Sequence, residues 1–337
     1  MRKVSAIVIQ QHGDPLEVPR VEERELPPPG PLEAVIEMLA APINPADLNV
    51  IEGTYPIRPE LPGVPGGEGV GRVLEIGTEV DGLAIGETVL LPHGFGSWRE
   101  AGIAAVDDLI RVPAGLPLAM VAMLKINPAT ALCMLRAFET LSSGDWLAQN
   151  AANSGVGRAV IQIAHHYGLK TLNFVRDLAV ADELKADGAT VVLRDEKEAK
   201  REWPDFESMP PRLALNAVGG DSATRLAGAL APGGTLVTYG AMARQPVRLP
   251  NGLLIFGDIR ARGFWITKWY REASPDERAA LFAELFRLIG ADVLKAKVER
   301  TYPVTEAAAA IRHATQSGRG GKILFAAPGI DLAHSRS

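Results

Sequence analysis

One stretch constrains the fold of this chain more than any other. Residues 145–158 read Asp-Trp-Leu-Ala-Gln-Asn-Ala-Ala-Asn-Ser-Gly-Val-Gly-Arg. The pattern predicts a short buried strand over Trp146 to Gln149, a small glycine-bearing turn, and a helix over Val156 to Tyr167, which has apolar residues at helical spacing. This succession is typical of the first crossover of a dinucleotide-binding unit, in which backbone N–H groups at the helix N-terminus hold a pyrophosphate.

The turn matches the Gly-x-Gly-x-x-Gly fingerprint of such units only in part. Ala152 and Ser154 occupy the first two glycine positions, and Gly157 occupies the third. Both replacements are small, so the backbone can still approach a phosphate closely. The spacing alone also fits an ordinary tight turn between a strand and a helix.

A second apolar segment ends about 20 residues beyond the turn, where dinucleotide-binding folds meet the adenosine ribose. Thr171 to Val175 is predicted to be a strand, and Arg176 and Asp177 follow it. An acidic residue there holds the 2′-hydroxyl of NAD, whereas an arginine pairs with the 2′-phosphate of NADP. Because both residue types are present side by side, the spacing does not choose between the two cofactors.

The composition of the whole chain excludes several classes of protein. The 337 residues are enough for two domains, and 35 basic against 40 acidic residues give a net charge of −5, which disfavours general nucleic-acid binding. Cys133 is the only cysteine, and no Cys or His cluster has the spacing of zinc ligands, so no disulfide and no metal are expected. No transmembrane-length apolar run and no signal-peptide pattern is present, and we expect a cytoplasmic protein without a membrane partner.

The residue composition and the predicted secondary structure change along the chain. The first third is rich in proline, glycine and short strand signals, which predicts a small β-rich domain, and its prolines predict extended or turned loops over residues 42–59. Asn127 is predicted to cap a helix that begins at Pro128. Strands and helices then alternate, as a doubly wound parallel sheet requires, and one of these strands is predicted over Arg260 to Trp269.

Several short stretches together resemble the medium-chain dehydrogenase/reductase superfamily. They are the glycine-rich run 62–71, Asn44 to Asp47, Glu52 to Tyr55, Asn127-Pro128, the turn at 150–157, Val175 to Asp177 and Gly263 to Ile266. Without zinc ligands, the chain most resembles the 2-enoyl thioester reductases among the zinc-free branches, from about residue 41 to residue 325. Gly67, where this branch is expected to have asparagine, and the approach to Tyr55 over residues 50–52 depart from the pattern. These departures bear more on the substrate than on the fold.

The resemblance implies a fold and a domain order. It implies an α/β protein in which a doubly wound parallel (Rossmann) domain is inserted into a β-rich GroES-like catalytic domain, with the active site in the cleft. The catalytic domain would comprise residues 1–120 plus 296–337, and the dinucleotide-binding domain residues 121–295. It also implies a homodimer in which residues 260–269 extend the sheet of a second copy, because Phe264 to Ile266 would be an unfavourably apolar exposed edge.

The implied reaction is the NADPH-dependent reduction of the C2–C3 double bond of a 2-enoyl thioester carried by CoA or acyl carrier protein. It requires a hydride at C3, a proton at C2 and stabilisation of the enolate oxygen. Tyr55 matches the family's proton donor, because a phenol keeps its proton at neutral pH and can give it to a developing carbanion. Asn44 is implied to help hold the substrate or the cofactor amide, and Trp98 to shape the same pocket.

The same resemblance implies the NADPH contacts and makes Arg176 the ligand of the 2′-phosphate. The implied contacts are Asn127, Asn153, Ser154, Gly155, Val156, Gly157, Arg176, Asp177, Tyr239, Gly240, Ala241, Met242, Phe264, Trp265, Ile266 and Lys322.

Two other interpretations remain open. A quinone oxidoreductase of the same fold would share the glycine-rich run but would have less use for a proton donor at Tyr55. A catalytically silent relative could bind NADPH as a sensor or as a structural protein, because fold alone does not define function. The joint presence of Tyr55, Asn44 and Arg176 favours an enzyme, although a tyrosine or a tryptophan at positions such as 55 and 98 is often explained by packing.

Overall fold

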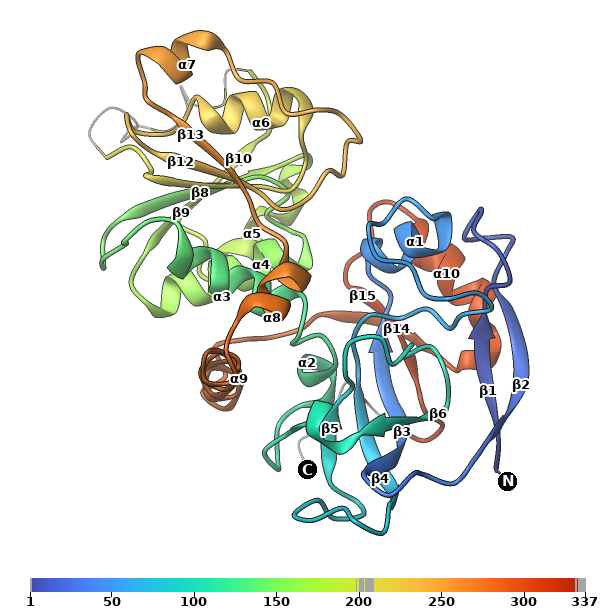
Figure 1. The fold of residues 1–337 in the computed structure, drawn as a ribbon. Coiled ribbons are helices and arrows are strands. Elements are labelled where there is room, and N and C mark those ends of the chain that lie inside the picture. Colours follow the sequence, from blue (N-terminus) through green and yellow to red (C-terminus); the bar gives the residue numbers. More distant parts are fainter. Residues whose placement is uncertain (1, 198, 200–202, 204–208, 331, 333–337) are drawn as a thin grey trace. The chain divides into compact units, whose positions relative to one another are not determined.

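The computed structural model of the chain describes residues 2–197, 199, 203, 209–330 and 332. The chain divides into two compact units, one of residues 1–125 and 296–337 and the other of residues 126–295. It therefore leaves the first unit after Lys125, completes the second unit, and returns to the first at Ala296 (Figure 1).

The second unit is built on a six-stranded parallel sheet. Its strands are β8 (Trp146–Gln149), β9 (Lys170–Val175), β10 (Val191–Arg194), β11 (Leu213–Asn216), β12 (Thr235–Thr238) and β13 (Arg260–Gly263). They lie in the order β10-β9-β8-β11-β12-β13, and each neighbouring pair is parallel. This is the strand order of a doubly wound dinucleotide-binding fold, so the predicted fold class is confirmed for this unit.

Helices cover both faces of this sheet (Figure 1). The helices of this unit are α3 (Asn127–Ala137), α4 (Gly155–His166), α5 (Ala181–Ala186), α6 (Gly220–Ala227), α7 (Asn251–Ile255), α8 (Ile266–Glu272) and α9 (Pro275–Gly290), with a short 3₁₀ turn η2 (Leu178–Val180) before α5. Side chains of one strand alternate between the faces: Phe174 packs in a cluster that includes Leu226 of α6, whereas Val175 packs in a second cluster with Ile161 of α4. Two layers of core thus hold the sheet in the middle of the unit.

The first unit is mainly β. A seven-stranded sheet contains β3 (Glu33–Pro42), β4 (Val70–Ile76), β5 (Thr88–Leu90), β6 (Ala101–Ala105), β7 (Ile110–Arg111), β14 (Val298–Tyr302) and β15 (Lys322–Ala326). A separate antiparallel pair consists of β1 (Arg2–Val8) and β2 (Arg20–Leu26). The helical segments are α1 (Pro45–Glu52), α2 (Leu118–Ala122) and α10 (Ala307–Thr315), with 3₁₀ turns η1 (Val106–Asp108) and η4 (Val304–Glu306).

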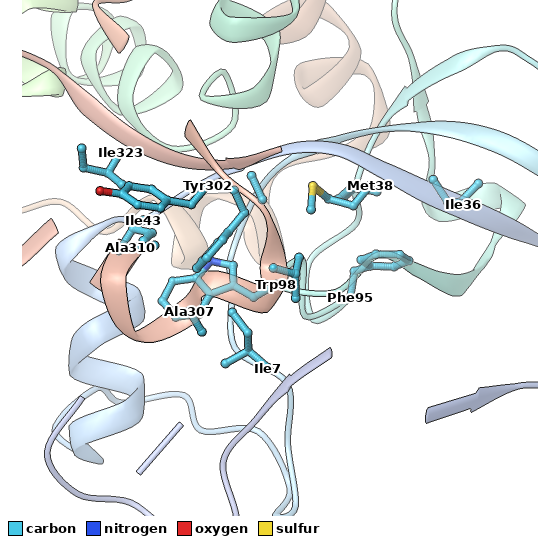
Figure 2. Close-up of a cluster of buried hydrophobic side chains, with 14 of the residues drawn as sticks. Ile7, Ile36, Met38, Ile43, Phe95, Trp98, Tyr302, Ala307, Ala310 and Ile323 are labelled. Atoms are coloured by element: carbon cyan, nitrogen blue, oxygen red, sulfur yellow. The ribbon is translucent and has the colours of Figure 1, made fainter. Parts of the chain in front are cut away.

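Segments from both ends of the chain share one core in the first unit. Figure 2 shows part of this cluster, in which Ile7 of β1 and Met38 of β3 lie with Tyr302 of β14 and Ile323 of β15. β15 pairs antiparallel with β3, so the returning chain is joined to the first third by backbone hydrogen bonds as well as by packing. Residues 296–330 therefore belong to the first unit although they lie far from it in sequence.

The prediction of one strand over residues 260–269 is wrong. β13 ends at Gly263, Trp265 is the N-cap of α8, and Ile266 is buried. The apolar pattern does not separate the two structures, because a short apolar segment fits a strand and a buried helix start equally well.

Two expectations about local structure also fail at prolines. Residues 45–52 form helix α1 rather than an extended loop, because Pro45 occupies the first helical turn, where a missing N–H does no harm. Asn127 is the first residue of α3 rather than its cap, and the cap position is Ile126. Cys133, in contrast, is buried as a free thiol.

Across the part of the chain that the structure describes, every helix is too short or too polar to span a bilayer.

Candidate functional site

The strand order of the second unit creates a switch point between β8 and β11. At this point the chain winds away in opposite directions, which leaves a crevice at the carboxyl ends of the strands in folds of this type. Asn150, the residue after β8, joins the two strand ends: its Nδ2 donates to Asn216 Oδ1 at 2.8 Å, and its Oδ1 accepts from Ala217 N at 2.7 Å. The buried amide thus sets the distance between the two loops that border the switch point.

The glycine turn leads directly into α4. Ser154 is the N-cap, and its Oγ accepts a hydrogen bond from Gly157 N at 3.1 Å. Gly157 could not carry a side chain, because a Cβ there would lie 2.5 Å from Ala152 O and 2.7 Å from Ala151 O. Ala151 has a positive φ of 48°, a conformation that side chains disfavour. The turn therefore meets two needs of a phosphate site, namely close packing of helix on strand and an accessible helix N-terminus.

A buried tyrosine hydroxyl lies beside this turn. Tyr239 follows β12, and its hydroxyl makes no hydrogen bond of normal geometry to any described residue, although Ser154 is near enough to affect its titration. Burial raises the pKa of Tyr239, so the group is a neutral donor. An unsatisfied buried hydroxyl in a native site calls for a partner, and a polar group of a bound dinucleotide meets that requirement.

The segment after Tyr239 lies along the same sheet edge. Met242 N donates to Ala217 O at 3.0 Å, and a Cβ on Gly240 would lie 2.9 Å from Ala217 O. Three predicted cofactor segments, at 153–157, 176–177 and 239–242, therefore meet at the carboxyl ends of β8, β9 and β12. The residues of this edge fit a dinucleotide.

Arg176 and Asp177 are both exposed after β9, but they are engaged differently. Asp177 Oδ1 accepts from Ala179 N at 3.0 Å and caps the 3₁₀ turn η2. No hydrogen bond or ion pair of Arg176 occurs among the described residues. The carboxylate is thus partly used by the fold, and the guanidinium is available at the place where an adenosine ribose would lie.

The other predicted cofactor residues of the second unit are more dispersed. Asn153 is exposed in the turn, Asn127 is buried in the first turn of α3, and Met242 is 58% exposed. Phe264 packs edge-on against Phe138, and the Arg271 guanidinium lies over the Trp265 ring. Both rings thus already have packing partners within their own unit.

In the first unit the predicted residues Asn44 and Lys322 are brought together, although 278 positions separate them. Lys322 Nζ donates to Asn44 Oδ1 at 2.6 Å, and Asn44 Nδ2 donates to Glu68 Oε1 at 2.7 Å. Asp47 holds the backbone next to this group of side chains: its two carboxylate oxygens accept from Asn44 N at 2.8 Å and from Gly67 N at 2.9 Å.

Burial changes the acid–base behaviour of this group. Desolvation raises the pKa of Asp47 to about 6, against the lowering effect of its two backbone hydrogen bonds and of Lys322. Desolvation lowers the pKa of Lys322, and Glu68 and Asp47 oppose that shift. Lys125, whose Nζ donates to Leu91 O at 2.5 Å, has its pKa lowered to about 8 by the same cause.

Tyr55 and Trp98 occupy different environments. Tyr55 is half-buried in the loop after α1, where its N–H donates to Asn49 O at 3.2 Å. Trp98 is fully buried in the core of Figure 2: its ring lies 5.2 Å from that of Phe325, and its Nε1 donates to Pro42 O at 3.3 Å. The pocket-shaping role of Trp98 stays a prediction, and its burial favours the packing alternative.

Reasoning from the sequence missed the residues that hold these groups in place. Glu68 and Asp47 lie within stretches quoted for the resemblance, but neither was assigned a role. Asn150 and Asn216 follow or end apolar strands, and a polar residue at such a place is the signal that could have pointed to them.

Comparison with known families first places the chain in a class. Residues 30–114 match the family model described as an alcohol dehydrogenase GroES-like domain, and residues 155–284 match the one described as a zinc-binding dehydrogenase. These two domains define a dehydrogenase/reductase of the medium-chain type, as the fold and the site indicate.

Comparison with individual relatives identifies the family within this class. The mitochondrial enoyl-[acyl-carrier-protein] reductase of Homo sapiens is 47% identical over 294 residues, which is 85% of this chain and 79% of the human protein. The structure of the enoyl thioester reductase Etr1p with NADP and crotonyl-CoA superposes with a TM-score of 0.88 at 28% identity, covering 97% of this chain and 100% of Etr1p. The mitochondrial Etr1p/Etr2p heterodimer of Candida tropicalis matches with a TM-score of 0.87 at 29% identity and the same coverage. The chain belongs to the 2-enoyl thioester reductase family.

The expected cytoplasmic location is wrong, because these relatives are mitochondrial proteins. The expectation was based on missing membrane-insertion signals, which carry no information about which aqueous compartment a protein occupies. Although one matching family model is described as zinc-binding, no group of three potential ligands among His, Cys, Asp and Glu is found in the described residues.

Proposed function

We propose that this protein is an NADPH-dependent reductase of the C2–C3 double bond of 2-enoyl thioesters. The observation that carries the proposal is the 47% identity to an enoyl-[acyl-carrier-protein] reductase over 85% of the chain. The Arg176 guanidinium follows β9 and makes no hydrogen bond or ion pair with the residues that the structure describes. It supports NADPH, because an arginine matches a 2′-phosphate in charge and geometry.

Different residues of the chain donate the proton, bind the cofactor and position the reacting groups. Bound NADPH supplies the hydride that reaches C3. Tyr55 holds the proton that C2 receives, because a neutral phenol can protonate a developing carbanion. Ser154, Gly157 and Tyr239 bind and orient the dinucleotide at the switch point, and Asn44 and Lys322 position the reacting groups. We assign the first unit, residues 1–125 plus 296–337, to the catalytic domain and the second unit, residues 126–295, to the dinucleotide-binding domain; the predicted boundary at 120/121 lies five residues earlier.

A substrate comparison tests the proposal. NADPH oxidation should be followed with crotonyl-CoA, with a longer 2-enoyl-CoA and with a small quinone. We expect rapid oxidation with at least one thioester and little with the quinone. The reverse ranking would replace the proposal by a quinone oxidoreductase, and NADPH binding without turnover of any substrate would indicate the catalytically silent relative.

The proton donor is tested by Tyr55→Phe. Loss of the hydroxyl should lower turnover of a 2-enoyl thioester by about 10²–10⁴-fold, the usual contribution of a positioned acid. The ring remains, so the thermal midpoint and the NADPH affinity should change little. Tyr302→Phe is a matched control, because the Tyr302 hydroxyl lies 3.0 Å from His313 Nδ1 within the core, and its loss should affect stability rather than turnover. Near-normal turnover in Tyr55→Phe would remove Tyr55 from the mechanism.

We also propose that the protein forms a homodimer through β13. This strand pairs only with β12 among the described strands, and its four residues are exposed. Next to it in sequence, Ile255 and Phe256 are 69% and 86% exposed. Pairing with a second copy would satisfy the open edge and cover these side chains. The homodimer is thus supported by the open edge of β13 and by the exposed residues at the end of α7. The apolar residues 264–266, on which the prediction from sequence was based, do not support it.

A further inference from the structure

Glu68 has no role in the function proposed so far, yet it is among the least exposed charged side chains of the first unit. It is 1% exposed and lies just before β4. Its Oε1 accepts from Asn44 Nδ2 at 2.7 Å, and its backbone carbonyl accepts from Ser97 Oγ at 2.7 Å. One hydrogen bond thus holds the carboxylate of Glu68 and a second holds its backbone, which places the side chain against Asn44.

The hydrogen-bond partners of Asn44 determine the orientation of its side-chain amide. A lysine ammonium only donates, so the amide atom 2.6 Å from Lys322 Nζ must be the oxygen, and the amide nitrogen must then face Glu68. An amide flip would set two donors against each other. The acid on one side and the cation on the other therefore determine how Asn44 presents its polar atoms.

Charged groups of both signs act on Lys322. Asp47 and Glu68 are buried carboxylates, Lys125 is a buried amine and Lys322 is half-buried. The charge of Glu68 favours the protonated form of both amines. Arg319 opposes the charge of Lys322. On the adjoining β14 and α10, Glu299 and His313 are 2.8 Å apart and form their own pair. Glu68 and Asp47 are thus the carboxylates that favour a protonated Lys322.

We propose that Glu68 is a positioning residue of the reductase: it orients the Asn44 amide toward Lys322, and its negative charge keeps the Lys322 ammonium protonated for cofactor binding. The inference rests on the proposed function in one respect, the assignment of Lys322 to NADPH. Glu68 acts through Asn44 and Lys322 and is not itself a catalytic residue.

Glu68→Gln separates the effect of the negative charge from that of the hydrogen bond, because it removes only the charge. A glutamine oxygen can still accept from Asn44 Nδ2, so the geometry is preserved while the charge is lost. NADPH affinity should be measured by fluorescence titration between pH 6 and pH 10. In the unmodified protein the affinity should fall as pH rises through the lowered pKa of Lys322, and in Glu68→Gln the midpoint of that fall should move to lower pH by about one unit or more.

Four further variants make the result specific. Lys322→Met should abolish the pH-dependent fall, and adding Glu68→Gln to it should then have no effect on the pH profile. Glu68→Asp keeps the charge and should retain the midpoint of the unmodified protein. Glu37→Gln is the control, because Glu37 pairs with Arg72 on the exposed side of β3 and β4, and it should leave both the midpoint and the affinity unchanged.

The outcomes separate this inference from the proposed function. An unchanged midpoint in Glu68→Gln, or a pH-independent NADPH affinity in the unmodified protein, would overturn the inference. So would a lowered thermal midpoint without any change in the pH profile, since that is the signature of a structural role alone. If Glu68→Gln does not fold, the decision is made with Glu68→Asp, which keeps the charge. A midpoint that moves to lower pH by about one unit or more in that variant would overturn the inference. A protein that shows the shift but does not reduce crotonyl-CoA would contradict only the proposed function.

Discussion

At the scale of single residues, burial decides which groups can react. Asp47, Lys125, Lys322 and Cys133 all have pKa values displaced by loss of water. In each case the charged form is disfavoured, because a low-dielectric surrounding solvates it poorly. Arg176 lies on the surface after β9, and an exposed guanidinium is the kind of group that binds a phosphate.

Arg176→Ala should remove the preference for NADPH. Loss of a charge-assisted contact to the 2′-phosphate should cost about 1.5–3 kcal/mol, which is about ten- to a hundredfold in affinity. The dissociation constants of NADPH and NADH should be measured for both proteins, and NADH binding should change little. Arg194→Ala is a control of the same residue type at the end of the neighbouring β10, where Arg194 pairs in register with Val175. A mutant that keeps its NADPH preference would refute the role of Arg176.

Cys133 should be unreactive in the folded protein. Burial raises the pKa of its thiol to about 12, whereas an unfolded cysteine titrates near 8.5. At pH 8 the folded state therefore contains about a thousandfold less thiolate, and thiolate is the reactive species. Modification by a disulfide reagent at pH 8 should be at least a hundredfold slower in native buffer than in urea. Equal rates would show that the thiol is exposed.

At the scale of elements, close backbone contacts place α4 and the glycine turn. The helix begins at Gly155 under the Ser154 cap, and Gly157 allows it to lie against the backbone of residues 151 and 152. α9 begins with a capping box in which Ser274 and Glu277 bond to each other's backbone N–H groups. The two helix starts resemble each other, but only the first borders the switch point.

Gly157→Ala should destabilise the second unit and weaken NADPH binding. A methyl group 2.5 Å from Ala152 O must push the helix away, and such overpacking costs about 1–3 kcal/mol. Gly228→Ala is the matched control: Gly228 ends α6 in a right-handed conformation, and a Cβ there would lie 3.4 Å from its nearest neighbour, Arg225 O. Chemical denaturation of both variants should show a loss only for Gly157→Ala. A loss of equal size in both would mean that the contact at Gly157 is not special.

At the scale of the whole molecule, the chain is two units with one continuous sequence passing between them. The first unit is completed only when β15 pairs with β3, so its sheet is joined across more than 270 residues of chain. The second unit lies within one continuous segment and ends its sheet on the open edge of β13.

The homodimer is tested at this scale. Sedimentation at micromolar concentration should show a species of twice the 35.9 kDa chain mass. Phe256→Asp should shift it toward the monomer, because a charge would be buried against the second copy. Ile85→Asp, at a 65% exposed position of the first unit, should leave the assembly intact. A monomer alone in the unmodified protein would refute the proposal.

Several features could be predicted from local sequence because their physical causes are local. The strand, turn and helix around Ser154 follow from side-chain periodicity and capping, and the doubly wound order is consistent with the alternation of strands and helices. The boundary at Gly263 and the helix at Pro45 were not predicted. A short apolar run and a proline each fit two conformations, and tertiary packing selects between them.

The sequence by itself determined the family and the residue types that the chemistry needs. Only the tertiary structure decided that Glu68 and Lys322 meet at Asn44, because a hydrogen bond between residues so distant in sequence depends on how β3 and β15 pair. It also decided that Trp98 is a core side chain and that Tyr239 leaves a buried hydroxyl beside Ser154. Burial is a property of the assembled fold rather than of any local stretch, and burial sets the charge state of the residues at the site.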